Sequence, residues 1–143
     1  MQSCVGAIFV LSLSLVVSSS CSENGQAKKP VRKSAPALSF TKDVFPIIQR
    51  RCLPCHAEDS FNPSELSMDS YESLKAGGKN GSPWVEGNSK ESILVKKLSE
   101  TPPFGERMPL NSKKKIAEGN ASWLTQDQID SIATWIDQGA KNN

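Results

Sequence analysis

The sequence has little histidine, few aromatic residues and no long apolar run. His56 is the single histidine of 143 residues, which excludes any site that needs two imidazoles from one chain, such as a bis-His haem or a His-x-x-x-His metalloprotease. No apolar stretch reaches the roughly 18 residues of a membrane-spanning helix. The net charge of +2 is too small for a nucleic-acid partner to be expected. The length fits one domain.

The N-terminal region divides into an export signal and a linker. Residues 5–17 form an apolar run of the length found in secretory signals, and small residues follow before Cys21. This pattern resembles a bacterial lipoprotein signal, in which that cysteine is acylated. The alternative is an ordinary cleaved signal that leaves Cys21 as a thiol. We predict a signal over 1–20 and an exported, periplasmic or cell-envelope protein held to a membrane by a lipid on Cys21.

Residues 21–38 show no apolar periodicity and predict a flexible tether. Its positive charges suit either anionic lipid headgroups or a solvated spacer.

Residues 39–143 predict a small all-α domain with a helix at each end and a loop-rich middle. Ser39 or Thr41 can cap the first helix, which becomes regular near residue 43 and runs into Cys52. Thr125 and Gln128 form a capping box for the last helix, over which apolar residues recur at helical spacing. The expected C-cap is Gly139.

Two shorter helices are expected in the middle of the domain. Asp69 can cap one that ends at Gly77, and Asn88 or Ser89 can cap another over residues 90–98. No strand pattern of useful length and no internal repeat accompany them. The fold class is therefore all-α.

The motif Cys52-Leu53-Pro54-Cys55-His56 has the spacing typical of covalent haem attachment. Two thiols three residues apart can lie on one side of a helical turn and add to the two vinyl groups, and His56 can then bind the iron. A zinc site lacks a fourth ligand nearby, a thioredoxin-like pair lacks its βαβ context, and a structural disulfide leaves His56 unexplained. One covalent haem c is the predicted cofactor.

The second axial ligand has to come from elsewhere, because histidine is exhausted. Met68, Met108, a lysine, a terminal amine or an open position remain. Met68 is only 12 residues after His56, whereas Met108 lies in a loop bracketed by prolines. We favour Met108, since a thioether is a soft ligand that stabilises ferrous iron.

On these residues the chain resembles a class I cytochrome c domain of the planctomycete type. The matching stretches are 40–48, 52–56, 66–70, 87–94, 105–109 and 135–140. The resemblance implies that Cys52 and Cys55 carry the haem, with His56 as proximal and Met108 as distal ligand. It also implies that the first and last helices pack together, with Trp135 in the core. For Arg107 it leaves open a haem propionate partner or exposure to solvent.

The predicted function is transfer of one electron by a monohaem cytochrome, without an enzymatic activity. Two alternatives remain at this point. One is a haem enzyme or gas sensor with an open iron, which the absence of a second histidine as distal acid or base argues against. The other is a haem-bearing docking module of a larger membrane complex. The redox donor and acceptor are left unnamed.

Overall fold

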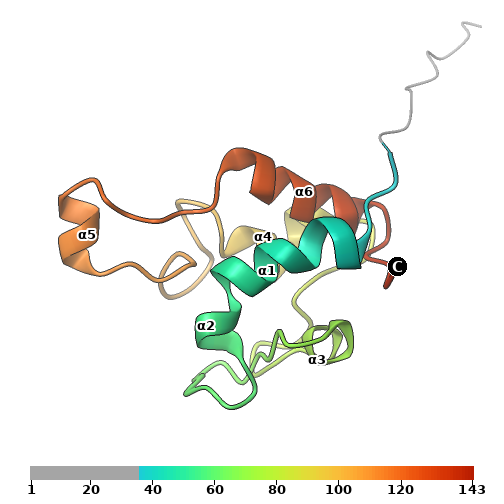
Figure 1. Ribbon diagram of the computed structural model, residues 1–143, viewed down its shortest axis with the longest axis horizontal. Coiled ribbons are helices and arrows are strands. Elements are labelled where there is room, and N and C mark those ends of the chain that lie inside the picture. The colour runs from blue at the N-terminus through green and yellow to red at the C-terminus, as the bar shows by residue number, and fades with distance from the viewer. Residues whose placement is uncertain (1–35) are drawn as a thin grey trace, which may run out of the picture. The chain divides into compact units, whose positions relative to one another are not determined.

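The computed structural model describes residues 36–143, which lie in one compact unit. Within these residues the regular structure is helical, and the β-structure consists of two isolated bridges, Gly78↔Gly81 and Val85↔Asn88. The predicted all-α class is confirmed. In chain order the elements are a π-helix (Phe40–Val44), α1 (Phe45–Arg51), α2 (Leu53–His56), α3 (Tyr71–Ala76), a 3-10 helix (Ser89–Glu91), α4 (Ile93–Lys96), α5 (Lys113–Ala117) and α6 (Gln126–Asp137) (Figure 1).

The first helix begins as the sequence indicates, with Ser39 as its N-cap. The Ser39 side chain accepts a hydrogen bond from the Lys42 N–H. The first turn is a π-helix, and regular α-helix starts at Phe45 rather than near residue 43. Pro46 is then the second residue of α1, where its missing N–H leaves no helical bond unmade.

The last helix follows its sequence signals closely. Both hydrogen bonds of the capping box between Thr125 and Gln128 are present at the start of α6. The C-cap is Gln138, one residue earlier than predicted. Gly139 comes next with φ of 97°, a backbone conformation that glycine adopts without the steric cost of a side chain.

The two end helices, α1 with its π-helical first turn and α6, lie side by side (Figure 1), and residues of both belong to one hydrophobic core. An aromatic cluster lies at its centre: the Trp135 ring centroid is 5.5 Å from that of Phe40 and 5.2 Å from that of Trp84, and Tyr71 packs against all three. Trp135 is 1% exposed, so its predicted place in the core is confirmed. The other fully or nearly fully buried apolar residues are Val44, Ile48, Met68, Leu74, Leu94, Leu98, Leu124, Ile132, Ile136 and Ala140.

The cap of α3 differs from the prediction. Ser70, not Asp69, accepts the hydrogen bond from the Ser73 N–H at the start of this helix. The Asp69 carboxylate instead accepts bonds from the Glu58 N–H at 2.6 Å and the Ser67 hydroxyl at 2.8 Å. Asp69 therefore stabilises the loop that precedes the helix.

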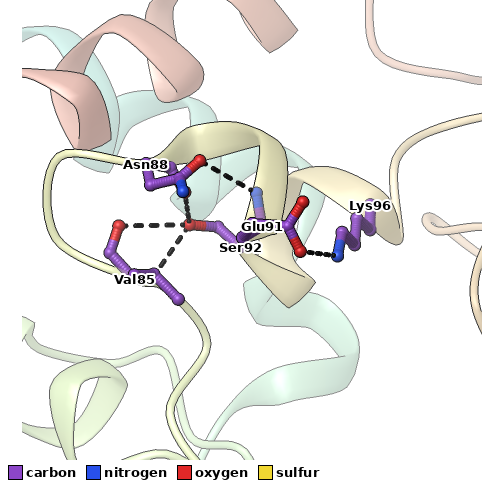
Figure 2. A network of polar contacts seen from close by, with 5 residues as sticks. All are labelled: Val85, Asn88, Glu91, Ser92 and Lys96. Carbon is purple, nitrogen blue, oxygen red and sulfur yellow. Dashed lines mark hydrogen bonds and ion pairs between the residues drawn. The ribbon is translucent and has the colours of Figure 1, made fainter.

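The single helix predicted over residues 90–98 is two short helices. Asn88 caps the 3-10 helix as expected, but the backbone of Ser92 is extended and separates it from α4. The buried Ser92 hydroxyl donates to the Asn88 carbonyl and accepts from the Val85 N–H (Figure 2). These bonds fold residues 85–92 back on themselves, which is a tertiary effect that helical periodicity does not reveal.

The helix α5 was not predicted. Ser112 caps it, and it is an exposed single turn that Figure 1 shows at the end of a long excursion between α4 and α6. Of the helices in residues 36–143, none has the length and apolar character needed to cross a membrane.

Candidate haem-attachment site

The Cys-x-x-Cys-His motif lies at the junction of α1 and α2. The Cys52 N–H still donates to the Ile48 carbonyl of α1 at 2.8 Å, and the His56 N–H donates to the Cys52 carbonyl at 2.9 Å. The motif is thus a continuous helical turn that presents both cysteines and the histidine from one short stretch. Cys52 is partly buried and Cys55 is exposed, and both are free thiols.

The imidazole of His56 is held in a defined tautomer. Its Nδ1 lies 3.1 Å from the Leu66 carbonyl oxygen. A carbonyl can only accept, so Nδ1 carries a proton, and in the neutral imidazole Nε2 then has the lone pair. The same arrangement orients histidine ligands in metal sites, where the partner of the second ring nitrogen fixes the ring. Asn62 Nδ2 donates to the same carbonyl at 2.7 Å.

The segment that carries the Leu66 carbonyl packs closely against the backbone at Gly78. A side chain on Gly78 would place its Cβ 2.4 Å from the Ser64 carbonyl oxygen and 2.8 Å from the Leu66 nitrogen, both closer than atoms pack. The Lys79 N–H also donates to the Ser64 carbonyl at 2.9 Å. Gly78 therefore allows the backbone approach that puts Leu66 in reach of His56.

The thiol of Cys52 is not prepared for thiolate chemistry. Burial raises the pKa of this thiol to about 11, against a smaller opposing effect of the Arg51 charge. Disulfide oxidoreductases and zinc sites use the thiolate, and such motifs depress the thiol pKa. Within residues 36–143 no three His, Cys, Asp or Glu side chains gather in a way that would bind a metal ion. The structure therefore supports neither a disulfide oxidoreductase nor a zinc site at this motif.

Met108 lies in the loop between α4 and α5. Its N–H donates to the Lys97 carbonyl at 2.8 Å, and its partly buried side chain packs against the same core as Cys52 and Leu53. Met68, the other methionine considered, is itself part of that core and is 4% exposed. The structure thus gives Met68 a packing role and leaves Met108 at the margin of the core.

Comparison with known proteins agrees with the motif. The model of the family described as planctomycete cytochrome C matches residues 52–109, which include every predicted haem ligand. These residues belong to the planctomycete cytochrome c family. A solved structure of Kuenenia stuttgartiensis hydrazine synthase is 29% identical, with a TM-score of 0.45, over 72% of this chain and 16% of that one. No curated protein matches the chain.

As a c-type cytochrome segment, residues 52–109 fit a covalent haem. The two free thiols and the Nε2 lone pair of His56 supply the donors that such a haem requires. Cys52 and Cys55 would form the thioether links, and His56 would bind the iron.

Sequence reasoning missed the residues that hold the loop around Met108. Lys97 Nζ donates to the carbonyl oxygens of Phe104 and Glu106, and partial burial lowers the pKa of this amine. Arg107, which the sequence left between two roles, donates through Nε to the Leu98 carbonyl at 2.9 Å. A lysine or arginine that bonds to backbone carbonyls across a loop leaves no pattern in the sequence. The predicted signal and the lipidation site at Cys21 lie outside the described residues.

Proposed function

We propose that this chain is a monohaem c-type cytochrome that carries one electron, with His56 and Met108 as axial ligands. The observation that carries the proposal is the hydrogen bond from His56 Nδ1 to the Leu66 carbonyl, directly beside two free thiols at haem-attachment spacing. It leaves Nε2 as the coordinating nitrogen without any rearrangement of the ring.

Different residues of the chain have different roles in electron transfer. Haem, when bound, supplies an iron that alternates between Fe(III) and Fe(II). Cys52 and Cys55 fix its position covalently, and the Leu66 carbonyl keeps the His56 ring in one orientation. Met108 provides a neutral, soft sulfur donor, which favours the reduced state and raises the potential. The sequence holds no second histidine to act as a distal acid or base, which favours a carrier over a peroxidase.

Optical and mass spectra of the exported protein test this proposal. We expect a pyridine haemochrome spectrum of a two-thioether haem, a mass increase of one haem, and a low-spin ferric spectrum with the thioether-to-iron charge-transfer band. Met108→Ala should abolish that band, whereas Met68→Leu should keep it. A high-spin iron that binds carbon monoxide rapidly in the wild-type protein would instead support the enzyme or sensor alternative.

We further propose that the cytochrome is exported and anchored to a membrane through acylated Cys21. The support is the sequence pattern, in which an apolar run and small residues precede this cysteine. Attachment of haem c to an exported chain also agrees with the family of residues 52–109. Detergent partitioning that is lost in Cys21→Ala is the expected result, and unchanged partitioning would contradict the anchor.

A further inference from the structure

Two arginines stand next to the segments assigned to the haem, and both contact Trp123. Arg51 precedes Cys52, and its Nη2 donates to the carbonyl oxygens of Ser122 at 2.9 Å and Trp123 at 2.7 Å. The Nε of Arg51 is buried and has no hydrogen-bond partner within residues 36–143, so the two Nη2 bonds are the hydrogen bonds that these residues make to the guanidinium. The segment before α6 is thereby joined to the end of α1.

Arg107 precedes Met108 and contacts the ring of Trp123. Its guanidinium carbon is 4.4 Å from the centroid of the Trp123 ring, within the range of a cation–π contact. Its Nε bond to the Leu98 carbonyl fixes the guanidinium at a second point. Trp123 therefore contacts both arginines: its backbone carbonyl accepts a hydrogen bond from Arg51, and its ring is stacked on Arg107.

Asn111 also connects the Met108 loop to the segment before α6. Asn111 accepts from the Ser122 N–H at 2.8 Å through Oδ1 and donates to the Pro109 carbonyl at 2.9 Å through Nδ2. The Met108 loop is consequently attached to residues 97–98 on one side and to residues 122–123 on the other.

We infer that Arg51, Arg107 and Trp123 form a clamp that positions the Met108 loop against the end of α1. The clamp sets how readily the Met108 thioether leaves the iron. This inference rests on the proposed function, because it requires Met108 as the axial ligand. The three residues are positioning residues, since they act through Met108 and are not themselves assigned to the iron.

The physical reason lies in the weakness of the ligand. A thioether carries no charge, so its retention depends on how firmly the protein holds the loop that carries it. An external ligand binds only the fraction of molecules in which Met108 is detached, and its apparent affinity rises in proportion to that fraction. The apparent affinity of the ferric protein for imidazole therefore measures how firmly the clamp holds Met108 on the iron.

The experiment uses the full-length, haem-loaded protein and titrates the ferric form with imidazole while the thioether-to-iron band is followed. Removal of the stacking contact in Arg107→Gln or Trp123→Leu should increase the apparent imidazole affinity about tenfold. The double variant should show no more than the larger single effect, because both changes break the same contact. Trp123→Phe keeps an aromatic ring and should stay closer to the wild type.

Two controls separate the clamp from charge and from general stability. Arg50→Gln removes the same charge from an exposed site on α1 and should leave imidazole affinity unchanged. Leu74→Val weakens the core in α3 and should lower the melting temperature without changing that affinity. Arg107→Lys keeps the charge without the planar fork, should give an intermediate affinity, and serves if Arg107→Gln is not recovered.

Imidazole affinities equal to the wild type in Arg107→Gln, Arg107→Lys and Trp123→Leu would overturn the clamp while Met108 ligation stands. Additive effects in the double variant would also overturn it. A wild-type protein that lacks the thioether band would overturn the proposed ligation itself, and the clamp with it. These results are distinguishable, because the band is recorded before imidazole is added.

Discussion

The two sides of the candidate haem site are built in different ways. Residues 52–56 are fixed by bonds to near neighbours: Ile48 is four residues before Cys52, and Leu66 is ten residues after His56. The loop over residues 104–111 is fixed from both directions along the chain, by residues 97–98 before it and by residues 122–123 after it. The predicted proximal side thus depends on one stretch of the chain, whereas the predicted distal side depends on two segments that the fold brings together.

This difference has a consequence for what can be perturbed. A change near residues 52–56 acts on haem attachment or on the orientation of one imidazole. A change in a residue distant from Met108 can still act on the distal side, because that loop has no regular secondary structure of its own between α4 and α5. Substitutions should therefore sort by the side that they reach. The imidazole titration of the clamp variants tests the distal side, and three substitutions and one thiol titration test the proximal side.

The largest effect is expected from removal of both thiols on the proximal side. In Cys52→Ala/Cys55→Ala, covalent haem should fall to background, because no thioether can form. Pyridine haemochrome absorbance per protein, together with the intact mass, measures this loss. Cys21→Ala is the matched control and should keep one haem. Covalent haem in the double variant would disprove the assignment of the motif.

Gly78→Ala should damage the proximal side through the backbone. The added methyl group meets the Ser64 carbonyl and the Leu66 nitrogen, so the segment that positions His56 must shift. We expect a loss of about 1–3 kcal/mol in unfolding free energy by urea titration, with an altered ferric spectrum.

Gly81→Ala provides the comparison for that variant. Gly81 has a positive φ of 81°, which Gly78 does not have, and open space around the added methyl group, so Gly81→Ala should lose stability through backbone strain without a spectral change. Equal spectral changes in both variants would mean that contact with residues 64–66 is not the cause of the change.

The pH dependence of the Cys52 thiol should differ between folded and unfolded chains made without haem. Iodoacetamide alkylation should follow a pKa of about 11 in buffer and the ordinary value of about 9.0 in urea. Because the folded pKa is the higher one, the stabilising contribution is complete below pH 9 and is lost as pH rises through 11, by at most about 1.4 kcal/mol per pH unit. Identical alkylation profiles in buffer and urea would show that the folded chain does not bury this thiol.

The smallest effect is expected for Asn62→Ala, which removes one of two donors from the Leu66 carbonyl. Stability should fall by about 1 kcal/mol. The carbonyl then accepts more strongly from His56 Nδ1, the imidazole becomes a better donor, and the reduction potential should decrease. Redox titration measures the potential. Asn142→Ala, which removes an exposed hydrogen bond from the Asn142 amide to the Glu72 carboxylate, should change neither quantity appreciably.

The same division separates what could be predicted from the sequence. The capping box of α6 and the helical turn over residues 52–56 depend on residues three or four positions apart, and both occur as predicted. Asp69 was assigned to a cap because its partner in the Glu58 backbone could not be seen in the sequence. Local patterns predict local bonds.

The distal side could be predicted only in part. Met108 was reached by elimination and by resemblance, whereas the contacts of Lys97, Arg107 and Trp123 depend on the tertiary fold. Likewise, the break at Ser92 depends on its buried hydroxyl bonds to residues 85 and 88. A side chain that bonds to a distant carbonyl has no preferred spacing, so no periodicity reveals it.

The pairing of the first and last helices also bears on the order in which parts of the chain can fold. The Thr41 N–H and hydroxyl both donate to the Asn143 carbonyl, which closes a loop of about 100 residues. Closing a loop of this length costs about 4 kcal/mol in chain entropy, plus a constant. The helical turn at Cys52 requires no such closure and can form in a chain that is still open. Covalent attachment can therefore come first during folding, while Met108 is held in place only after residues 122–123 have arrived.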